Sequence, residues 1–98
     1  MAGYKLSRNA ILEVADIVGY LHREVGSSVA DKTEKRLFAA FSDLAEGRAL
    51  GHRRTELTER NVLFHFADPY LIVFRKTAQT IYIVHVIHGS RDMKRLLQ

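Results

Sequence analysis

The side chains best suited to chemistry in this chain are basic, and most of them lie in its second half. Five arginines lie in a long aperiodic stretch or beside apolar runs that are typical of strands: Arg53, Arg54, Arg60, Arg75 and Arg91. Arginine keeps its charge at physiological pH and binds phosphate or carboxylate groups in a forked geometry. Each alone could form a salt bridge with Glu56, Glu59 or Asp92, but the cluster predicts a contact surface for nucleic acid or a protein partner.

The charge of the chain is unevenly distributed. The formal net charge is +4. Residues 1–46 carry six Lys or Arg against seven Asp or Glu, whereas residues 47–98 carry nine against four. A positive field of this kind attracts nucleic acid or an acidic protein. A solvated basic face without a partner is the alternative that charge alone leaves open.

The histidines and hydroxyls form no recognisable catalytic or metal-binding motif. His85 and His88 are three residues apart, which places them on opposite faces of a strand, and the chain has no cysteine. Ser90 and Asp92 follow His88 without a nucleophile elbow around them. The sequence also contains no phosphate-binding loop and no dinucleotide fingerprint. We therefore predict no catalytic residues, no metal site and no cofactor.

The stretch from Thr80 to Asp92 predicts the strand around which the chain is organised. On a regular strand its residues divide into two faces, with Ile81, Ile83, His85 and Ile87 on one and Tyr82, Val84, Val86 and His88 on the other. Both faces are largely apolar, which indicates a strand covered on both sides.

The remaining elements follow from hydrophobic spacing. Apolar periodicity predicts helices over residues 8–25 and 28–46, and strands over residues 4–6, 61–67 and 70–75. The order β-α-α-β-β-β predicts a single α+β domain spanning residues 1–98, in which a helical hairpin packs on a small, mainly antiparallel sheet. The predicted core includes Leu37, Phe41, Ile83 and Val84.

The composition excludes several classes of protein. A hydrophobic content of 47% with 27% charged residues is that of an ordinary globular domain. The first residues contain no apolar signal-peptide core, and no apolar run approaches the roughly 18 residues of a membrane-spanning helix. We therefore expect a cytoplasmic protein with no membrane partner.

Four segments in this order resemble the ParE branch of the RelE/ParE toxins from bacterial type II toxin–antitoxin systems. Y-K-L-S at residues 4–7 is similar to the opening strand and helix cap of the family, and L-G-H-R-R-T-E-L at residues 50–57 to its G-x-x-R-x-E-L loop. Y-L-I-V-F-R at residues 70–75 resembles its Y-L-I-x-Y-R strand, and I-V-H-V-I-H-G-S-R-D at residues 83–92 its closing V-x-x-V-x-H-G-x-R-D.

The resemblance implies a toxin that is not itself an enzyme, that inhibits DNA gyrase by trapping its cleaved-DNA intermediate, and that a ParD-like antitoxin neutralises. DNA would be reached only through gyrase or through the antitoxin complex. The candidate residues for contact with target or antitoxin are Arg53, Arg54, Arg60, Arg75, His88, Arg91, Lys94 and Arg95.

Two alternatives stay open at the level of the sequence. The RelE branch cleaves messenger RNA on the ribosome, a reaction that needs a base, an acid and cations for the phosphate. Arg75, His88 and Arg91 would then be candidates for catalysis, with Tyr82 as a substitute for the tyrosine that the tail after Gly89 lacks. The second alternative is an inactive module that still binds an antitoxin.

Overall fold

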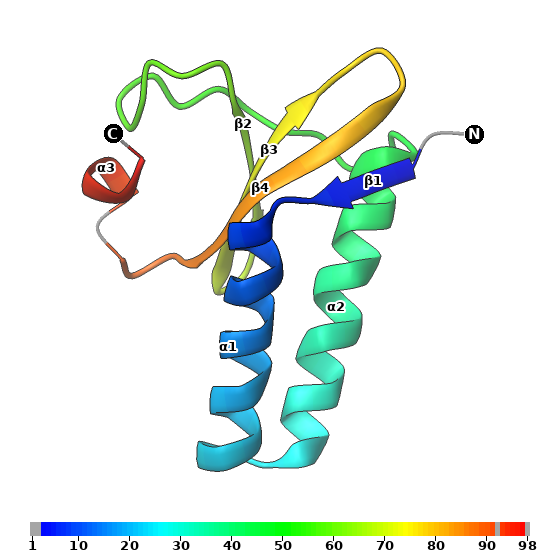
Figure 1. Cartoon of the computed structure of the whole chain (residues 1–98), viewed down its shortest axis with the longest axis vertical. Helices are drawn as coiled ribbons and strands as arrows, with labels where there is room; N and C mark the ends of the chain where they lie inside the picture. Colours follow the sequence, from blue (N-terminus) through cyan, green and yellow to red (C-terminus); the bar gives the residue numbers. More distant parts are fainter. Residues whose placement is uncertain (1–2, 92, 98) are drawn as a thin grey trace.

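A computed structural model describes residues 3–91 and 93–97 of the chain (Figure 1). Its elements are β1 (Gly3–Leu6), α1 (Arg8–Glu24), α2 (Ser27–Ala45), β2 (Leu63–Ala67), β3 (Tyr70–Lys76), β4 (Thr80–His88) and α3 (Met93–Leu96). The two long helices lie side by side and cover one face of the sheet. The predicted α+β order and the helical hairpin are confirmed. None of the described helices is both long enough and apolar enough to cross a membrane.

β4 is an inner strand of the sheet, with β1 on one side and β3 on the other. The strand order is β1-β4-β3-β2, in which β3 pairs antiparallel with both β4 and β2, and β1 pairs parallel with β4. A parallel pair needs a long crossover connection. Here the helical hairpin, β2 and β3 all lie between β1 and β4 in the sequence. The mainly antiparallel sheet with a three-strand meander is therefore as predicted.

The start of α1 is tied to the central strand. Oγ of Ser7 accepts a hydrogen bond from N of Ala10 (3.0 Å), which caps the helix, and donates one to O of Val84 (2.6 Å). At the other end of the hairpin, Gly47 follows α2 with φ of +77°, a left-handed conformation that glycine adopts at little cost. These two points fix where the hairpin meets the sheet.

Apolar side chains fill both faces of the sheet. The face under the helices packs around Leu37, Phe41, Ile72, Phe74, Ile81 and Ile83. The other face has a second cluster of Val62, Phe64, Leu71, Val73, Ile87 and Leu97. Leu97, which follows α3, is 2% exposed, so the C-terminal turn covers the face that the helices leave open. The prediction of a central strand covered on both sides is confirmed in part, since Ile87 is covered on this second face while Tyr82 and Val84 are only half-buried.

An irregularity in β4 corrects the predicted division of its faces. Val73 lies opposite His85, whereas the next residue of β3, Phe74, lies opposite Ile83. Val84 is therefore an extra residue on β4, and the simple alternation of faces is interrupted there. Such a bulge depends on the pairing of two strands, which the sequence of one strand does not contain.

The bulge changes which residues are buried in which cluster. Val86, predicted to face away from Ile83, packs with it under the helices, and Ile87 belongs to the second cluster. Val84 is only half-buried, so its assignment to the core is wrong. Leu37, Phe41 and Ile83 are at most 1% exposed, and their assignment is confirmed.

Glu13 of α1 supports β4 just beyond the bulge. β1 pairs with β4 only as far as Ile83, which leaves the following backbone groups without a strand partner on that side. The carboxylate of Glu13 accepts a hydrogen bond from N of Val86 (2.9 Å) and lies 3.1 Å from Nδ1 of His85. The Glu13 side chain thus accepts a backbone hydrogen bond that a neighbouring strand would otherwise accept.

Tyr70, buried at the start of β3, provides a prediction about pH. Burial raises the pKa of its hydroxyl above the usual value, and the charge of Arg36 offsets this only in part. Because the unfolded chain releases this proton at about pH 10 and the folded chain at a higher pH, the folded chain binds more protons in that window. We expect the free energy of unfolding to fall as pH rises above about 10.

Denaturant unfolding of the wild type and of Tyr70→Phe, from about pH 9 to about pH 11, measures this effect. Above about pH 10, the free energy of unfolding of the wild type should fall relative to that of Tyr70→Phe. Parallel curves would show that Tyr70 ionises equally easily in both states.

Gly51 lets the loop after α2 pass close to the core. A Cβ at this position would lie 2.6 Å from Cε1 of Phe74 and 3.0 Å from Cβ of Leu63. Phe74 is only 2% exposed, so a shift of its ring would disturb the packed core around it. Gly51→Ala should therefore lower the free energy of unfolding by about 1–3 kcal/mol. Gly3→Ala is the control, since its Cβ meets nothing within 4 Å; equal effects of the two substitutions would refute the close approach.

Candidate functional site

A groove of about 450 Å³ lies on the face of the sheet away from the helical hairpin. It runs from the junction between β1 and α1, across β4 and β3, to the end of the loop that precedes β2. The residues that line this basic groove are Ser7, Arg60, Asn61, Val62, Arg75, Tyr82 and Val84. The bulged Val84 is one of them, so the irregularity of β4 shapes the groove.

Arg75 and Tyr82 form the floor of the basic groove. They are directly opposite each other on β3 and β4, and the guanidinium carbon of Arg75 lies 5.1 Å from the centroid of the Tyr82 ring. This is a cation–π contact, in which the negative face of the ring attracts the guanidinium. Because both residues belong to paired strands, the arginine is held at a defined place on the sheet.

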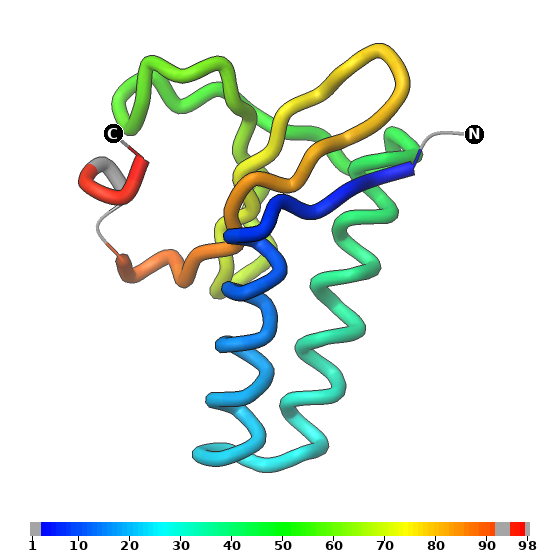
Figure 2. Tube along the Cα trace, viewed as in Figure 1, coloured from blue at the N-terminus to red at the C-terminus, as the bar shows by residue number. Residues whose placement is uncertain are grey.

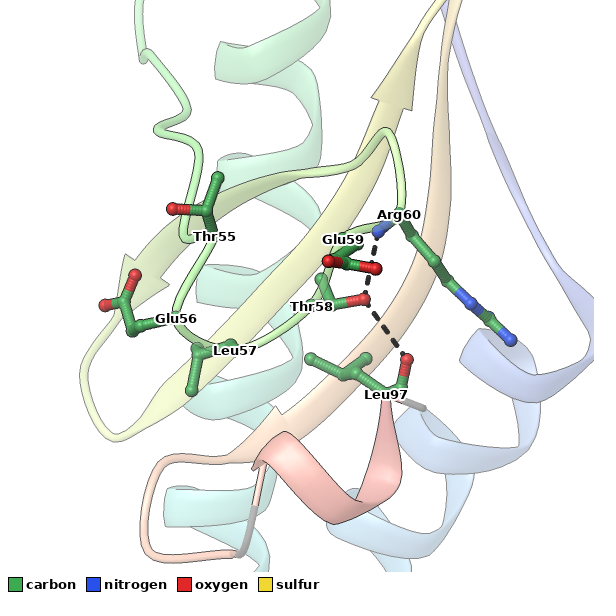
Figure 3. Close-up of a pocket in the computed structure, with 7 residues that line it drawn as sticks. All are labelled: Thr55, Glu56, Leu57, Thr58, Glu59, Arg60 and Leu97. Atoms are coloured by element: carbon green, nitrogen blue, oxygen red, sulfur yellow. Dashed lines mark hydrogen bonds between the residues drawn. The ribbon is translucent and has the colours of Figure 1, made fainter.

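The loop before β2 brings further polar side chains to the groove. Oγ1 of Thr58 accepts a hydrogen bond from N of Arg60 (3.1 Å), which fixes the backbone where the Arg60 side chain begins. Nη1 of Arg53 donates to Oδ1 of Asn61 (2.8 Å), so Arg53 lies at the rim. Figure 3 shows the Arg60 side chain extending away from the carboxylates of Glu56 and Glu59.

The basic groove carries positive charge without a neutralising acid. Of the described residues that line it, none is Asp or Glu, and no described carboxylate forms an ion pair with Arg60 or Arg75. A second hollow, which shares Asn61 and Arg75, adds Lys76. Ser7 marks the start of α1, whose first turn contains no acid, so the positive end of that helix also faces the groove.

Arg54, which was predicted to belong to the contact surface, is engaged elsewhere. Its Nε donates a hydrogen bond to Oε2 of Glu56 (2.7 Å) in an exposed ion pair. The same hydrogen bond lowers the pKa of the Glu56 carboxyl below its usual value. Arg54 therefore has the local ion pair that the sequence offers as the alternative for a single arginine, and its part in a contact surface stays a prediction.

The residues predicted near the end of β4 form a separate group. His88 is six residues beyond Tyr82, or roughly 20 Å along the strand. Its Nδ1 accepts a hydrogen bond from N of Ser90 (3.1 Å) and lies 2.7 Å from Oγ of the same residue, and its ring packs edge-to-face with Tyr70. Arg91 and Arg95 are exposed beyond it, while the side chain of Lys94 and the whole of Asp92 lie outside the described residues.

The strand ends thus divide the predicted arginine set in two. Arg53, Arg60 and Arg75 gather around Asn61, whereas His88 ends β4 and Arg91 and Arg95 follow it in the sequence. The expectation that these arginines form one cluster is therefore corrected. Neighbouring antiparallel strands run in opposite directions, so β3 and β4 end at opposite ends of the sheet. His85 joins neither group, because it faces Glu13.

A larger hollow of about 520 Å³ lies between residues 55–60 and Leu97 (Figure 3). Oγ1 of Thr58 donates to O of Leu97 (3.3 Å), and the C-terminal turn lies beside the loop (Figure 2). Glu56 and Glu59 both line this hollow. Two carboxylates disfavour an anionic ligand here, so we take the basic groove as the candidate site.

Of the residues that line the basic groove, only Arg60 and Arg75 are among the contact residues predicted from the sequence. Tyr82 entered only as a substitute catalytic residue, and Asn61 was not singled out. The alternation of β4 carries a signal for Tyr82, because it points away from Ile81 and Ile83. That Arg75 lies opposite Tyr82 depends on the register of β3 and β4, which is visible only in the folded sheet.

Comparisons with known proteins agree with this fold. A family model described as the ParE toxin of the type II toxin–antitoxin system parDE matches residues 4–93. Among solved structures, a chain of the chromosomal ParDE toxin–antitoxin system from P. aeruginosa superposes with a TM-score of 0.73. The match covers 90% of this chain and 96% of that one at 18% sequence identity, a likeness of fold. No curated protein matches the chain in sequence.

Proposed function

The chain belongs to the family of ParE toxins of type II toxin–antitoxin systems, and from this premise we propose that it traps DNA gyrase on cleaved DNA in the bacterial cytoplasm. We propose further that it is not an enzyme and that a ParD-like antitoxin neutralises it. The observation that carries the proposal is the acid-free basic groove, in which Arg60 and Arg75 are available for a partner. DNA is then reached as part of the gyrase complex or through the antitoxin.

The arrangement of side chains favours binding over strand cleavage. A metal-independent nuclease needs a base, an acid and a cation around one phosphate. Arg75 and Tyr82 are together, but no histidine lies among the described residues of the basic groove, and His88 is roughly 20 Å away along β4. This separation supports a toxin that acts by holding its target.

The surface also offers apolar area for an antitoxin. Ile11 and Leu12 on the outer side of α1 are 55% and 54% exposed, and Tyr20 on the same helix is 55% exposed. Large exposed apolar side chains on one helix offer apolar area that a protein partner could cover. An antitoxin segment that covers this helix and pairs its acids with the basic groove would hide both kinds of surface.

Induced expression in a bacterium tests the proposal. The chain should arrest growth and activate a DNA-damage reporter while the 5′ ends of messenger RNA stay unchanged, and co-expression of a ParD-like antitoxin should abolish both effects. New messenger ends within open reading frames, with a silent reporter, would instead place this chain with the ribosome-dependent nucleases. Growth without arrest would identify an inactive, antitoxin-binding module.

A further inference from the structure

We infer that the basic groove binds a single strand of nucleic acid, with Arg60 and Arg75 on successive phosphates and a base stacked over the Arg75–Tyr82 pair. This deepens the proposed function and rests on it for one point, namely that gyrase supplies the strand. It also goes further, since the toxin itself would contact the DNA that gyrase holds cleaved.

The charges of the groove fit a phosphodiester chain. The guanidiniums of Arg60 and Arg75 have no ion pair with a described carboxylate, so no internal partner has to be displaced. Each guanidinium offers two parallel N–H donors to a phosphate. Arg53 at the rim, Lys76 in the adjoining hollow and the start of α1 extend this positive surface along the groove.

The Arg75–Tyr82 pair fits a base. Nucleic-acid-binding sites stack unpaired bases on aromatic rings and on the planes of arginine side chains. Here the guanidinium carbon of Arg75 already lies over the Tyr82 ring, 5.1 Å from its centroid, on paired strands that hold both side chains in place. Val62 and Val84 add apolar walls, and the volume of about 450 Å³ is within the range of sites for small molecules.

An acidic peptide is the competing ligand. Its carboxylates would pair with the same guanidiniums, but they would leave the Tyr82 ring and the apolar walls of Val62 and Val84 without a matching group. A nucleotide satisfies both halves of the groove, which is why we favour a nucleic acid strand.

Fluorescence anisotropy with the full-length chain tests the inference. The probes are labelled oligothymidylate and oligouridylate of about 12 nucleotides, measured from about 50 to about 200 mM salt. The double variant Arg60→Gln/Arg75→Gln should bind at least about tenfold more weakly, and the slope of log K against log salt should decrease by roughly 1.4, which corresponds to two phosphates. The matched control is Lys32→Gln/Lys35→Gln, which removes the same charge from exposed positions on α2 and should leave binding within about twofold of the wild type.

Substitutions of Tyr82 measure the contribution of base stacking separately from that of charge. Tyr82→Leu should weaken binding by about tenfold without a change in salt slope, whereas Tyr82→Phe should bind as the wild type does. Circular dichroism and thermal unfolding of each variant show that the fold is kept. A base-free probe, polyphosphate, should not distinguish Tyr82→Leu from the wild type.

Three results would overturn the inference: no binding of either oligonucleotide, an equal loss in the groove and control variants, or binding of an acidic peptide but not of an oligonucleotide. Tighter binding of oligothymidylate supports DNA as the source of the strand. Tighter binding of oligouridylate also supports a nucleic-acid groove, but one that serves RNA. Because no gyrase is present, a failure here leaves the gyrase proposal standing, and a failure to trap gyrase leaves this result standing.

Discussion

Replacing Phe41 with alanine is expected to lower the free energy of unfolding by about 3–5 kcal/mol. The Phe41 side chain is completely buried, and its ring packs against Tyr4 of β1 (5.5 Å between centroids) and Phe38 of α2 (5.4 Å). The substitution would therefore leave a cavity at the point where α2 meets the sheet, and surrounding side chains on two different elements cannot readily collapse into it.

Chemical denaturation of wild type, Phe41→Ala and Phe66→Ala measures this effect. Phe66→Ala removes the same atoms at a position that is 58% exposed. It should lower the free energy of unfolding by about 1 kcal/mol or less, well below the loss from Phe41→Ala. Comparable losses at the two positions would mean that Phe41 is not in the core that joins helix to sheet.

The second large effect concerns toxicity. The double variant Arg60→Gln/Arg75→Gln should need an intracellular concentration at least about a hundredfold higher to arrest growth, because each charged hydrogen bond to a partner contributes about 1.5–3 kcal/mol. Neither arginine has an ion pair with a described carboxylate, so their removal should cost only about 0.5–1 kcal/mol, from the contact of Arg75 with Tyr82. Growth curves over a titrated promoter, with toxin levels from immunoblots, give the ratio.

Two comparison variants locate the effect. Lys32→Gln/Lys35→Gln removes the same charge from α2 and should arrest growth as the wild type does. Arg91→Gln tests the second group, near the end of β4, which the sequence placed with the first and the structure separates from it. Full toxicity of the groove variant together with loss of toxicity in Arg91→Gln would move the contact surface to that end of the sheet.

Most of the fold could be predicted because local signals agree with one another. The Ser7 cap, the stripe of apolar residues that includes Leu37 and Phe41, and the glycine after α2 each define part of the helical hairpin. The apolar stretch at residues 80–88 correctly indicated a central strand. These signals depend on residues near one another in the sequence, which is why sequence reasoning reached them.

The features that sequence reasoning missed depend on pairing between distant segments. The bulge at Val84 exists only relative to β3, and it moves Val86 under the helices. The meeting of Arg75 with Tyr82 is set by the same register. The contact role of the arginines therefore stays a prediction from the sequence, while their division between two ends of the sheet required the structure.

The most direct test of the account uses purified DNA gyrase, supercoiled plasmid and the purified chain. With the wild type and with Lys32→Gln/Lys35→Gln, denaturation of the reaction should release linear, cleaved plasmid, and the ParD-like antitoxin should prevent it. Arg60→Gln/Arg75→Gln should leave the plasmid uncut. Uncut plasmid with the wild-type chain, at concentrations that arrest growth, would contradict the proposal that this toxin poisons gyrase.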